Sequence, residues 1–265
     1  MIEVDALPGD GETTTWEVRR DGRTLGTAVT GVRRSGPLLT GLDVPRETAS
    51  DALDALLEAV RDRGERSLVV DVRTGDSVLE TALRGRDARL VATQMRLDLS
   101  QSVETPDRVQ LLAMTRDEFA AYREHLVTSY AQDMVDAGAF DDLPTALTAS
   151  ERSTRELLPG GLESPGHHLW SAVDGDTVVG ILWIHADGAN AFIYDIEVRE
   201  EQRRRGYGRE ILDAGAVAAR ALGAEVLGLN VFGNNEGARA LYERAGYDTT
   251  ERTFRVSLAG DGVAR

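Results

Sequence analysis

The residues best suited to chemistry lie in a basic turn that joins a strand at 191–198 to a helix. Four arginines and two glycines lie within the run Arg203-Arg204-Arg205-Gly206-Tyr207-Gly208-Arg209. Backbone N–H groups at such a turn and the positive end of the following helix favour an anion. Gly206 and Gly208 let the backbone approach a pyrophosphate closely, and the arginines add charge-assisted hydrogen bonds. A dinucleotide fingerprint is excluded because Ile211 stands where its third glycine should be.

A second motif follows the next predicted strand, at 226–231. It reads Asn235-Glu236-Gly237-Ala238-Arg239-Ala240-Leu241-Tyr242-Glu243-Arg244-Ala245-Gly246-Tyr247. Asn235 is a good helix N-cap, and Tyr242 suits an amphipathic helix. Taken alone, this segment predicts only a packing helix, so its value comes from the combination with the basic turn.

The combination resembles the GNAT superfamily of N-acetyltransferases. That family carries R/Q-x-x-G-x-G/A after its fourth strand and N-x-x-A-x-x-L-Y-x-x-x-G-F/Y after its fifth. Arg203–Gly208 and Asn235–Tyr247 satisfy both patterns, at the family's usual separation. The segment Pro165–Ser171 further resembles a subgroup of small bacterial acetyltransferases. The resemblance implies transfer of acetyl from acetyl-CoA to a primary amine by direct attack in a ternary complex.

The resemblance also implies roles for individual residues. Ile196 and Val198 would pair through their backbone with the pantetheine arm, and the Val198 amide would stabilise the oxyanion. Asn235 would hydrogen-bond the pantetheine, and Tyr242 would protonate the departing thiolate as a general acid. The pyrophosphate would be held by residues of the turn: Arg203, Arg204, Arg205, Gly206, Gly208 and Arg209. No metal is needed, and the sequence shows no cluster of metal ligands.

The general base has several candidates. A protonated amine must lose its proton before it can attack, directly or through water. Asp195 and Glu197 alternate onto one face of the fourth strand, and we expect one of them to border the acceptor site. Further candidates are three histidines: His167, His168 and His185.

Composition limits the partners. The net charge is −15, all thirty basic residues are arginine, and cysteine is absent. Nucleic-acid binding needs a basic footprint, so we expect no such partner. No apolar run approaches the ~18 residues of a membrane span, so we predict a cytoplasmic protein, monomeric or homodimeric, with no membrane partner. The acceptor would be an amine-bearing small molecule or a peptide N-terminus.

Two stretches of the chain, 15–99 and 168–258, match each other along their length. The matches share one offset up to Val44, which matches Val198, and an offset five residues larger from Gly64 onward. The matched pairs include Leu25-Gly26 with Val179-Gly180, Leu68 with Leu227, and Met95–Leu99 with Phe254–Leu258. Two ungapped blocks with one deletion between them favour a duplication.

The first copy has lost the chemistry. The five missing residues fall on the anion-binding turn and leave Val44–Thr48 without a glycine. Leu83 stands where Tyr242 stands, and Asp76 where Asn235 stands. We therefore expect a degenerate GNAT-like domain that binds no coenzyme.

The elements must fold around these motifs as two α+β modules. Each is expected to be a mixed, mainly antiparallel twisted sheet flanked by helices. We expect a degenerate domain at 1–100, a linker at 101–110 and a catalytic domain at 111–265. Thr115 and Glu118 predict a capping box that opens a helix running to about Val135. The alternative function is a non-catalytic acyl-CoA-binding module whose N-terminal half binds another protein.

Overall fold

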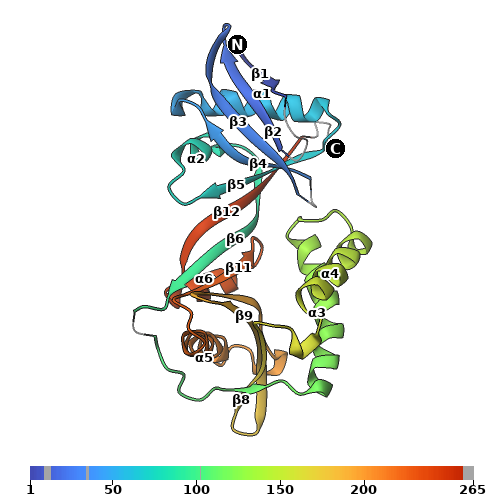
Figure 1. Cartoon of the computed structure of the whole chain (residues 1–265), viewed down its shortest axis with the longest axis vertical. Helices are drawn as coiled ribbons and strands as arrows, with labels where there is room; N and C mark the ends of the chain where they lie inside the picture. Colours follow the sequence, from blue (N-terminus) through green and yellow to red (C-terminus); the bar gives the residue numbers. More distant parts are fainter. Residues whose placement is uncertain (9–12, 34–35, 102, 259–265) are drawn as a thin grey trace. The chain divides into compact units, whose positions relative to one another are not determined.

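The structure, a computed structural model, describes residues 1–8, 13–33, 36–101 and 103–258 (Figure 1). Its described residues form two compact units. The first contains residues up to Ala92 together with those from Glu251 onward, and the second is Thr93–Thr250. None of the helices in the described ranges is long and apolar enough to span a membrane.

The first unit is a sheet of strand order β1-β2-β3-β4-β5-β12, with β4 and β5 parallel and the other defined pairs antiparallel. Its strands are β1 (Ile2–Ala6), β2 (Thr13–Arg20), β3 (Arg23–Arg33), β4 (Gly36–Asp43), β5 (Ser67–Arg73) and the end of β12 (Asp248–Ser257). Its helices are the short η1 (Arg46–Thr48), α1 (Ala49–Asp62) and α2 (Ser77–Leu83). Leu53 and Leu56 of α1 pack on Leu68 of β5 in a fully buried core.

The second unit repeats this plan with two added helices. Its strand order is β7-β8-β9-β10-β11-β6, and β10 and β11 are parallel. The strands are β6 (Ala88–Asp98), β7 (Gln110–Ala113), β8 (His167–Asp174), β9 (Thr177–Asp187), β10 (Asn190–Val198) and β11 (Val226–Phe232). The helices are α3 (Arg116–Asp136), α4 (Leu143–Leu157), η2 (Gly161–Glu163), η3 (Glu200–Gln202), α5 (Tyr207–Ala221) and α6 (Glu236–Arg244).

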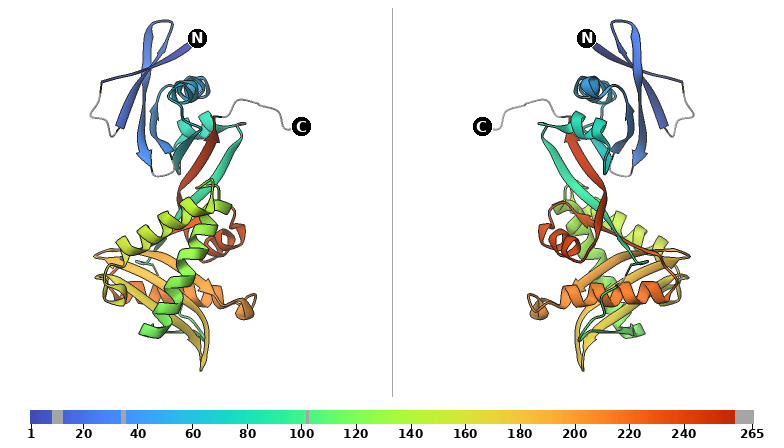
Figure 2. Two further views of the ribbon diagram at one scale, coloured as in Figure 1. Left: turned by 90° about the vertical axis from the view of Figure 1, so that its right-hand side faces the viewer. Right: turned by 90° about the vertical axis from the view of Figure 1, so that its left-hand side faces the viewer.

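Helices cover both faces of this second sheet (Figure 2). Leu182 and Ile184 of β9 point into the core formed with α5, whereas Trp183 between them packs with residues of α3. Successive strand residues point to opposite faces, so α5 and α3 lie on opposite sides of the sheet. The predicted α+β fold with a mixed, mainly antiparallel sheet is confirmed.

Helix α3 begins at the predicted capping box. The Thr115 hydroxyl accepts from the Glu118 N–H, and the Glu118 carboxylate accepts from the Thr115 N–H at 2.7 Å. The helix ends at Asp136, one residue beyond the predicted Val135. This long helix carries three residues that line the candidate site described below, Leu126, Tyr130 and Asp133, and a fourth, Tyr122, that bonds to a residue of that site.

The two units share their strand register. In both parallel pairs the matched residues are partners, Leu39 with Val70 and Ile193 with Leu229. Both fourth strands skip one residue against the neighbouring strand, at Thr40 in β4 and Tyr194 in β10. A structural repeat therefore extends down to single backbone hydrogen bonds, as the matching sequence blocks predicted.

The last strand of each repeat completes the sheet of the other unit. Residues 251–257 of β12 pair antiparallel with β5 of the first unit, and Leu258 N–H donates to Arg66 C=O at 2.9 Å. Strand β6 of the first repeat borders β11 of the second unit, where Leu99 N–H donates to Glu225 C=O at 2.8 Å.

We call this arrangement, in which each repeat gives its last strand to the other unit, the strand exchange. Because of it, the two units differ from the domain boundaries expected from the sequence. Residues 93–110 belong to the second unit rather than to a separate linker, and residues 251–258 belong to the first. Each parallel pair leaves the outer edge of β5 or β11 with unpaired backbone groups, and the exchanged strand provides their partners.

The exchange predicts a crossed pattern of destabilisation. Leu99→Ala, a change in the first repeat, should lower the stability of the second unit by about 2 kcal/mol, because Leu99 is buried in that unit's core. Leu258→Ala, at the matching position of the second repeat, should loosen the first unit instead. Amide hydrogen exchange measures both, with rates rising about thirtyfold in α5 and β11 for Leu99→Ala and in α1 and β5 for Leu258→Ala. Loosening confined to the mutated repeat's own unit would contradict the exchange.

Candidate functional site

The fourth and fifth strands of the second unit separate at their carboxyl ends. Parallel pairing of β10 with β11 runs only from Asn190 and Val226 to Ile193 and Leu229, although β10 continues to Val198. The skipped residue Tyr194 bends β10 at the point where the pairing stops. The two strands therefore diverge and leave a gap in the ladder.

Backbone groups of Ile196 and Val198 face this gap. Arg199 N–H donates to Val179 C=O on β9. Because backbone hydrogen bonds alternate along an antiparallel strand, Glu197 and Asp195 also bond to β9, whereas the residues between them do not. The backbone groups of Ile196 and Val198 consequently point away from β9, toward the side of β11. They are placed to form strand-like hydrogen bonds with an extended, amide-bearing ligand, as expected for a pantetheine arm.

A cavity of about 380 Å³ opens beside the gap, between the diverging strands and helices α3, α4 and α6. It brings together the predicted residues Asp195, Ile196, Asn235 and Tyr242. The rest of its lining is largely apolar and aromatic and comes from Leu126, Tyr130, Leu157, Trp183, Phe192, Ile193, Tyr194, Leu229, Val231 and Phe232, with Gln94, Asp133, Ser153, Thr154 and Asn230.

Tyr242 lies on α6, is buried and lines the cavity. Burial, with a smaller contribution from the Asp195 charge, raises the pKa of Tyr242 to about 12. Its hydroxyl has no hydrogen-bond partner among the described residues. The phenol therefore stays protonated at neutral pH and is free to donate into the cavity.

Asn235 is the N-cap of α6. Its Oδ1 accepts from Ala238 N–H at 3.0 Å, which fixes the side chain and leaves the Nδ2 amide to donate into the cavity. The structural role and the predicted ligand-binding role are therefore compatible.

Asp195 is a half-buried carboxylate at the same cavity. Burial raises its pKa to about 6, opposed by a hydrogen bond from the Tyr122 hydroxyl at 2.8 Å. The nearby Glu197 charge raises it further. A carboxylate whose pKa lies near neutrality is suited to accept a proton at physiological pH.

Glu197 lies away from Tyr242, at a separate cavity of about 260 Å³ that Tyr122 and Glu118 also line. Its carboxylate contacts His125 at 3.2 Å and Arg203 at 3.8 Å. The two predicted catalytic carboxylates are therefore neighbours, but only Asp195 lines the cavity that contains Tyr242.

The basic turn combines a left-handed backbone with amides that lack an acceptor among the described residues. Gly206, at φ 88°, is the N-cap of α5, and Arg204 is left-handed at φ 67°. Among the described residues no acceptor is found for the N–H groups of residues 204–208. Left-handed residues next to a helix start orient consecutive N–H groups toward one point, which is the arrangement of an anion site.

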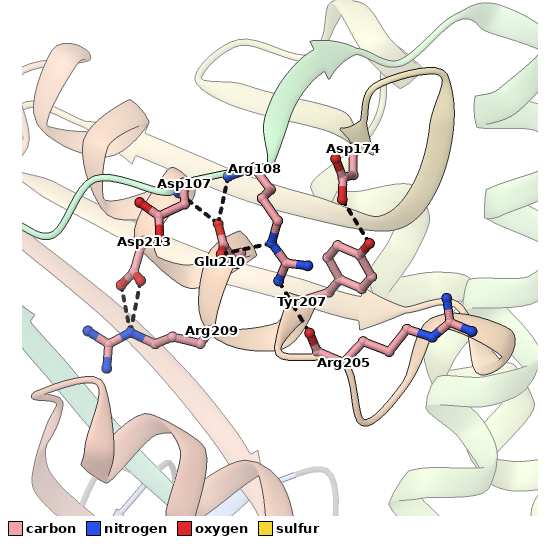
Figure 3. A network of polar contacts seen from close by, with 8 residues as sticks. All are labelled: Asp107, Arg108, Asp174, Arg205, Tyr207, Arg209, Glu210 and Asp213. Carbon is pink, nitrogen blue, oxygen red and sulfur yellow. Dashed lines mark hydrogen bonds and ion pairs between the residues drawn. The ribbon is translucent and has the colours of Figure 1, made fainter.

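The shape of the turn is held by a network from a distant segment (Figure 3). The Glu210 carboxylate accepts from the N–H groups of Asp107 and Arg108, at 2.9 and 3.1 Å. The Arg108 guanidinium donates to Arg205 C=O at 3.2 Å and lies 4.7 Å above the Tyr207 ring. Arg108 could not be predicted from the sequence, because nothing in the local pattern connects it to a helix a hundred residues later.

The arginines of the turn differ in their side-chain partners. The Arg209 guanidinium donates to Asp213 and to Arg244 C=O, both at 2.9 Å, and Arg203 donates to Val198 C=O at 3.2 Å. Arg204 and Arg205 are exposed, and only Arg205 has a side-chain acceptor in the described ranges, Gln202 at 3.2 Å. These two guanidinium groups are the most available to a phosphate. Gly208 lies against α6, since an added Cβ would meet Leu241 at 3.0 Å.

The three candidate histidines lie beside the cavity rather than in it. The rings of His167 and His185 are 4.4 Å apart, and His167 Nδ1 accepts from the Trp183 indole at 2.9 Å. Burial and the two other histidines lower the pKa of His167 to about 4, and burial and His185 lower that of His168. His167 is therefore neutral and orients Trp183, which does line the cavity.

Comparison with known proteins finds relatives of the second unit. The model of the acetyltransferase (GNAT) family matches residues 129–247. The uncharacterized N-acetyltransferase YycN of Bacillus subtilis (strain 168) is 40% identical over 156 residues, which cover 57% of this chain and 99% of YycN. The uncharacterized N-acetyltransferase YdgE of the same organism is 34% identical over 150 residues, covering 55% and 95%.

Solved structures show the same fold. The crystal structure of YycN from Bacillus subtilis matches with a TM-score of 0.51 and 36% identity, over 59% of this chain and 96% of that chain. A GCN5-related N-acetyltransferase from Sphaerobacter thermophilus matches with a TM-score of 0.55 and 19% identity, over 95% of this chain and 82% of its own. Since the chain covers nearly all of YycN at this identity, the resemblance read from the sequence is confirmed, and the chain belongs to the GNAT family of acetyltransferases.

Proposed function

We propose that the second unit transfers an acetyl group from acetyl-CoA to a primary amine, which attacks directly in a ternary complex. The observation that carries the proposal is one cavity that holds a carboxylate of raised pKa, Asp195, and an unpartnered phenol, Tyr242. Beside it lie the segment Ile196–Val198, which no longer pairs with β11, and the turn whose amides lack an acceptor among the described residues. These features fit the two amides and the pyrophosphate of coenzyme A.

Each residue has a separate task in this proposal. The Asp195 carboxylate accepts a proton from the incoming ammonium, directly or through water, and Tyr122 orients that carboxylate. The Tyr242 hydroxyl donates its proton to the departing sulfur. The Val198 N–H, which faces the gap, stabilises developing negative charge on the carbonyl oxygen. Acetyl-CoA supplies the activated thioester.

The test is thiolate release from acetyl-CoA in the presence of a panel of primary amines, with mass spectrometry of the products. Amine-dependent release with an acetylated amine supports the proposal. Tight acetyl-CoA binding without turnover on any amine would instead support the alternative, a non-catalytic acyl-CoA-binding module.

We propose further that the first unit binds no coenzyme. Its fourth strand is joined to α1 by Val44, Pro45 and the short η1, without the glycine turn of the second unit. Leu83, at the position of Tyr242, packs against the unit's core, and Asp76 keeps only the capping role of Asn235. Calorimetric titration of the full chain should therefore give one acetyl-CoA per chain, and a stoichiometry of two would contradict a degenerate first unit.

A glycine pair tests the location of the site. Gly206→Ala should weaken acetyl-CoA binding about tenfold, because a side chain at φ 88° is strained by roughly 1–2 kcal/mol and the relaxed turn would redirect its N–H groups. Gly64→Ala is the matched control. It sits at φ 89° after α1 in the first unit, with no atom within 4 Å of an added Cβ. Equal binding by both variants, measured calorimetrically, would remove the turn from the coenzyme site.

A further inference from the structure

The mouth of the cavity carries two exposed tyrosines. Tyr130 and Tyr194 are each 39% exposed, among the few large apolar side chains that are exposed in the described ranges. Tyr194 stacks on Trp183 with ring centroids 4.9 Å apart, and Tyr130 packs against Phe232 at 5.8 Å. Both rings are thus held from behind by another aromatic residue, which leaves aromatic surface at the mouth of the cavity.

A carboxylate without a cation lies beside these rings. Asp133, one turn beyond Tyr130 on α3, also lines the cavity. The pKa of Tyr130 is raised mainly by burial, and further by Asp133 and Tyr194. The Asp133 side chain has no hydrogen bond or ion pair with any residue in the described ranges. Burial raises the pKa of Asp133, and the charges of Asp136 and Glu197 raise it further. This direction is expected for a carboxylate that lacks a positive partner.

The charged side chains that line the cavity among the described residues are all negative. The lining contains two carboxylates, Asp133 and Asp195, and no arginine or histidine among the described residues. An ammonium or guanidinium group is attracted both by a carboxylate and by the faces of aromatic rings. Tyr242, more than nine-tenths buried, also lines this cavity, and its hydroxyl has no partner among the described residues, so the cavity offers a polar group to a ligand.

The two carboxylates lie beside different turns of α3. Asp195 is bonded to Tyr122, and Asp133 lies about three helical turns further along α3. An elongated molecule with a positive charge at each end can contact both carboxylates.

We infer that the acceptor is an elongated amine with a second, remote cationic group, and that Asp133, Tyr130 and Tyr194 bind this group. The inference rests on the proposed acetyl transfer, with the reacting amine at Asp195 and Tyr242. It narrows the acceptor from any primary amine to diamines, polyamines and molecules that likewise carry two separated positive charges.

The experiment compares monoamines with diamines of the same chain length, using the full chain. Hexylamine is matched with hexamethylenediamine, and decylamine with decamethylenediamine, with ethylenediamine as a diamine too short to reach both ends. The longer diamines should exceed their monoamines in kcat/KM by about tenfold, the scale of one cation–π contact with an ion pair at a cavity mouth. Asp133→Asn should reduce this ratio to about one. The control Asp136→Asn, which removes a charge on the same helix outside the cavity lining, should keep it.

Calorimetric binding of the same diamines separates the two hypotheses. If no amine is acetylated but diamine binding is lost in Asp133→Asn, the acetyl transfer is wrong and the cation site stands. If monoamines and diamines are acetylated equally, by wild type and by Asp133→Asn, the cation site is overturned and the acetyl transfer stands. Equal diamine binding by both proteins also overturns the cation site.

Discussion

Replacing Asp195 by asparagine is expected to lower kcat/KM for a primary amine by about 10³-fold, within the range of one general-base contribution. The substitution keeps the size of the side chain and a carbonyl oxygen that accepts from Tyr122, but removes the proton acceptor. Acetyl-CoA binding should be nearly unchanged, because the proposed role of Asp195 is to take a proton from the acceptor amine and not to hold the coenzyme. Steady-state kinetics and calorimetric titration check the two halves of this expectation.

The pH profile identifies the base independently. Because burial raises the pKa of Asp195 to about 6, the active carboxylate form is present above this pH and is lost below it. The wild-type kcat/KM should therefore fall as the pH drops through about 6, and Asp195→Asn should lack this limb. A limb near pH 4 would point instead to His167, whose pKa is about 4.

Glu197→Gln is the comparison for this prediction. Glu197 lies two residues along the same strand, but it contacts His125 and Arg203 and lines the other cavity. Glu197→Gln should therefore lower kcat/KM far less than Asp195→Asn does. A larger loss for Glu197→Gln than for Asp195→Asn would exchange the two roles.

Tyr242→Phe is expected to lower kcat by about 10²-fold while acetyl-CoA affinity persists. The change removes one hydroxyl that lines the cavity and keeps the buried ring in place. Since the pKa of Tyr242 is about 12, its acid form is present throughout the usual assay range, so this residue should add no basic limb to the profile. Single-turnover thiolate release separates the chemical step from product release.

Tyr247→Phe provides a matched control on the same motif. Tyr247 is also buried, its ring centroid lies 6.0 Å from that of Tyr242, and its hydroxyl has no partner in the described part of the chain. Tyr247 does not line the cavity, so removal of its hydroxyl should leave turnover unchanged. Because that hydroxyl is buried and unsatisfied, its removal should not destabilise the fold either. Wild-type turnover in Tyr242→Phe would show that water protonates the thiolate.

The sequence by itself determined the family, the fold class and the internal repeat. These follow from local information: the glycines and arginines of 203–209, the helix motif 235–247, and the constant offsets between matching blocks. The capping box at Thr115 and the loss of the turn in the first repeat are equally local. The motifs and the capping box depend on residues close together along the chain, and the repeat is visible from matching residue types alone.

Tertiary structure alone decided which of these residues meet. Asp195 and Glu197 are equivalent in the alternating pattern of a strand, and only the packing of α3 gives Asp195 a bond to Tyr122 and a place beside Tyr242. Arg108 reaches the basic turn, and Asp133 the cavity mouth, through contacts across the fold. The strand exchange is of the same kind, since β6 and β12 match in sequence and either could complete either sheet. Such choices depend on which open edge or cavity wall is near in space, and neighbours along the chain do not encode that.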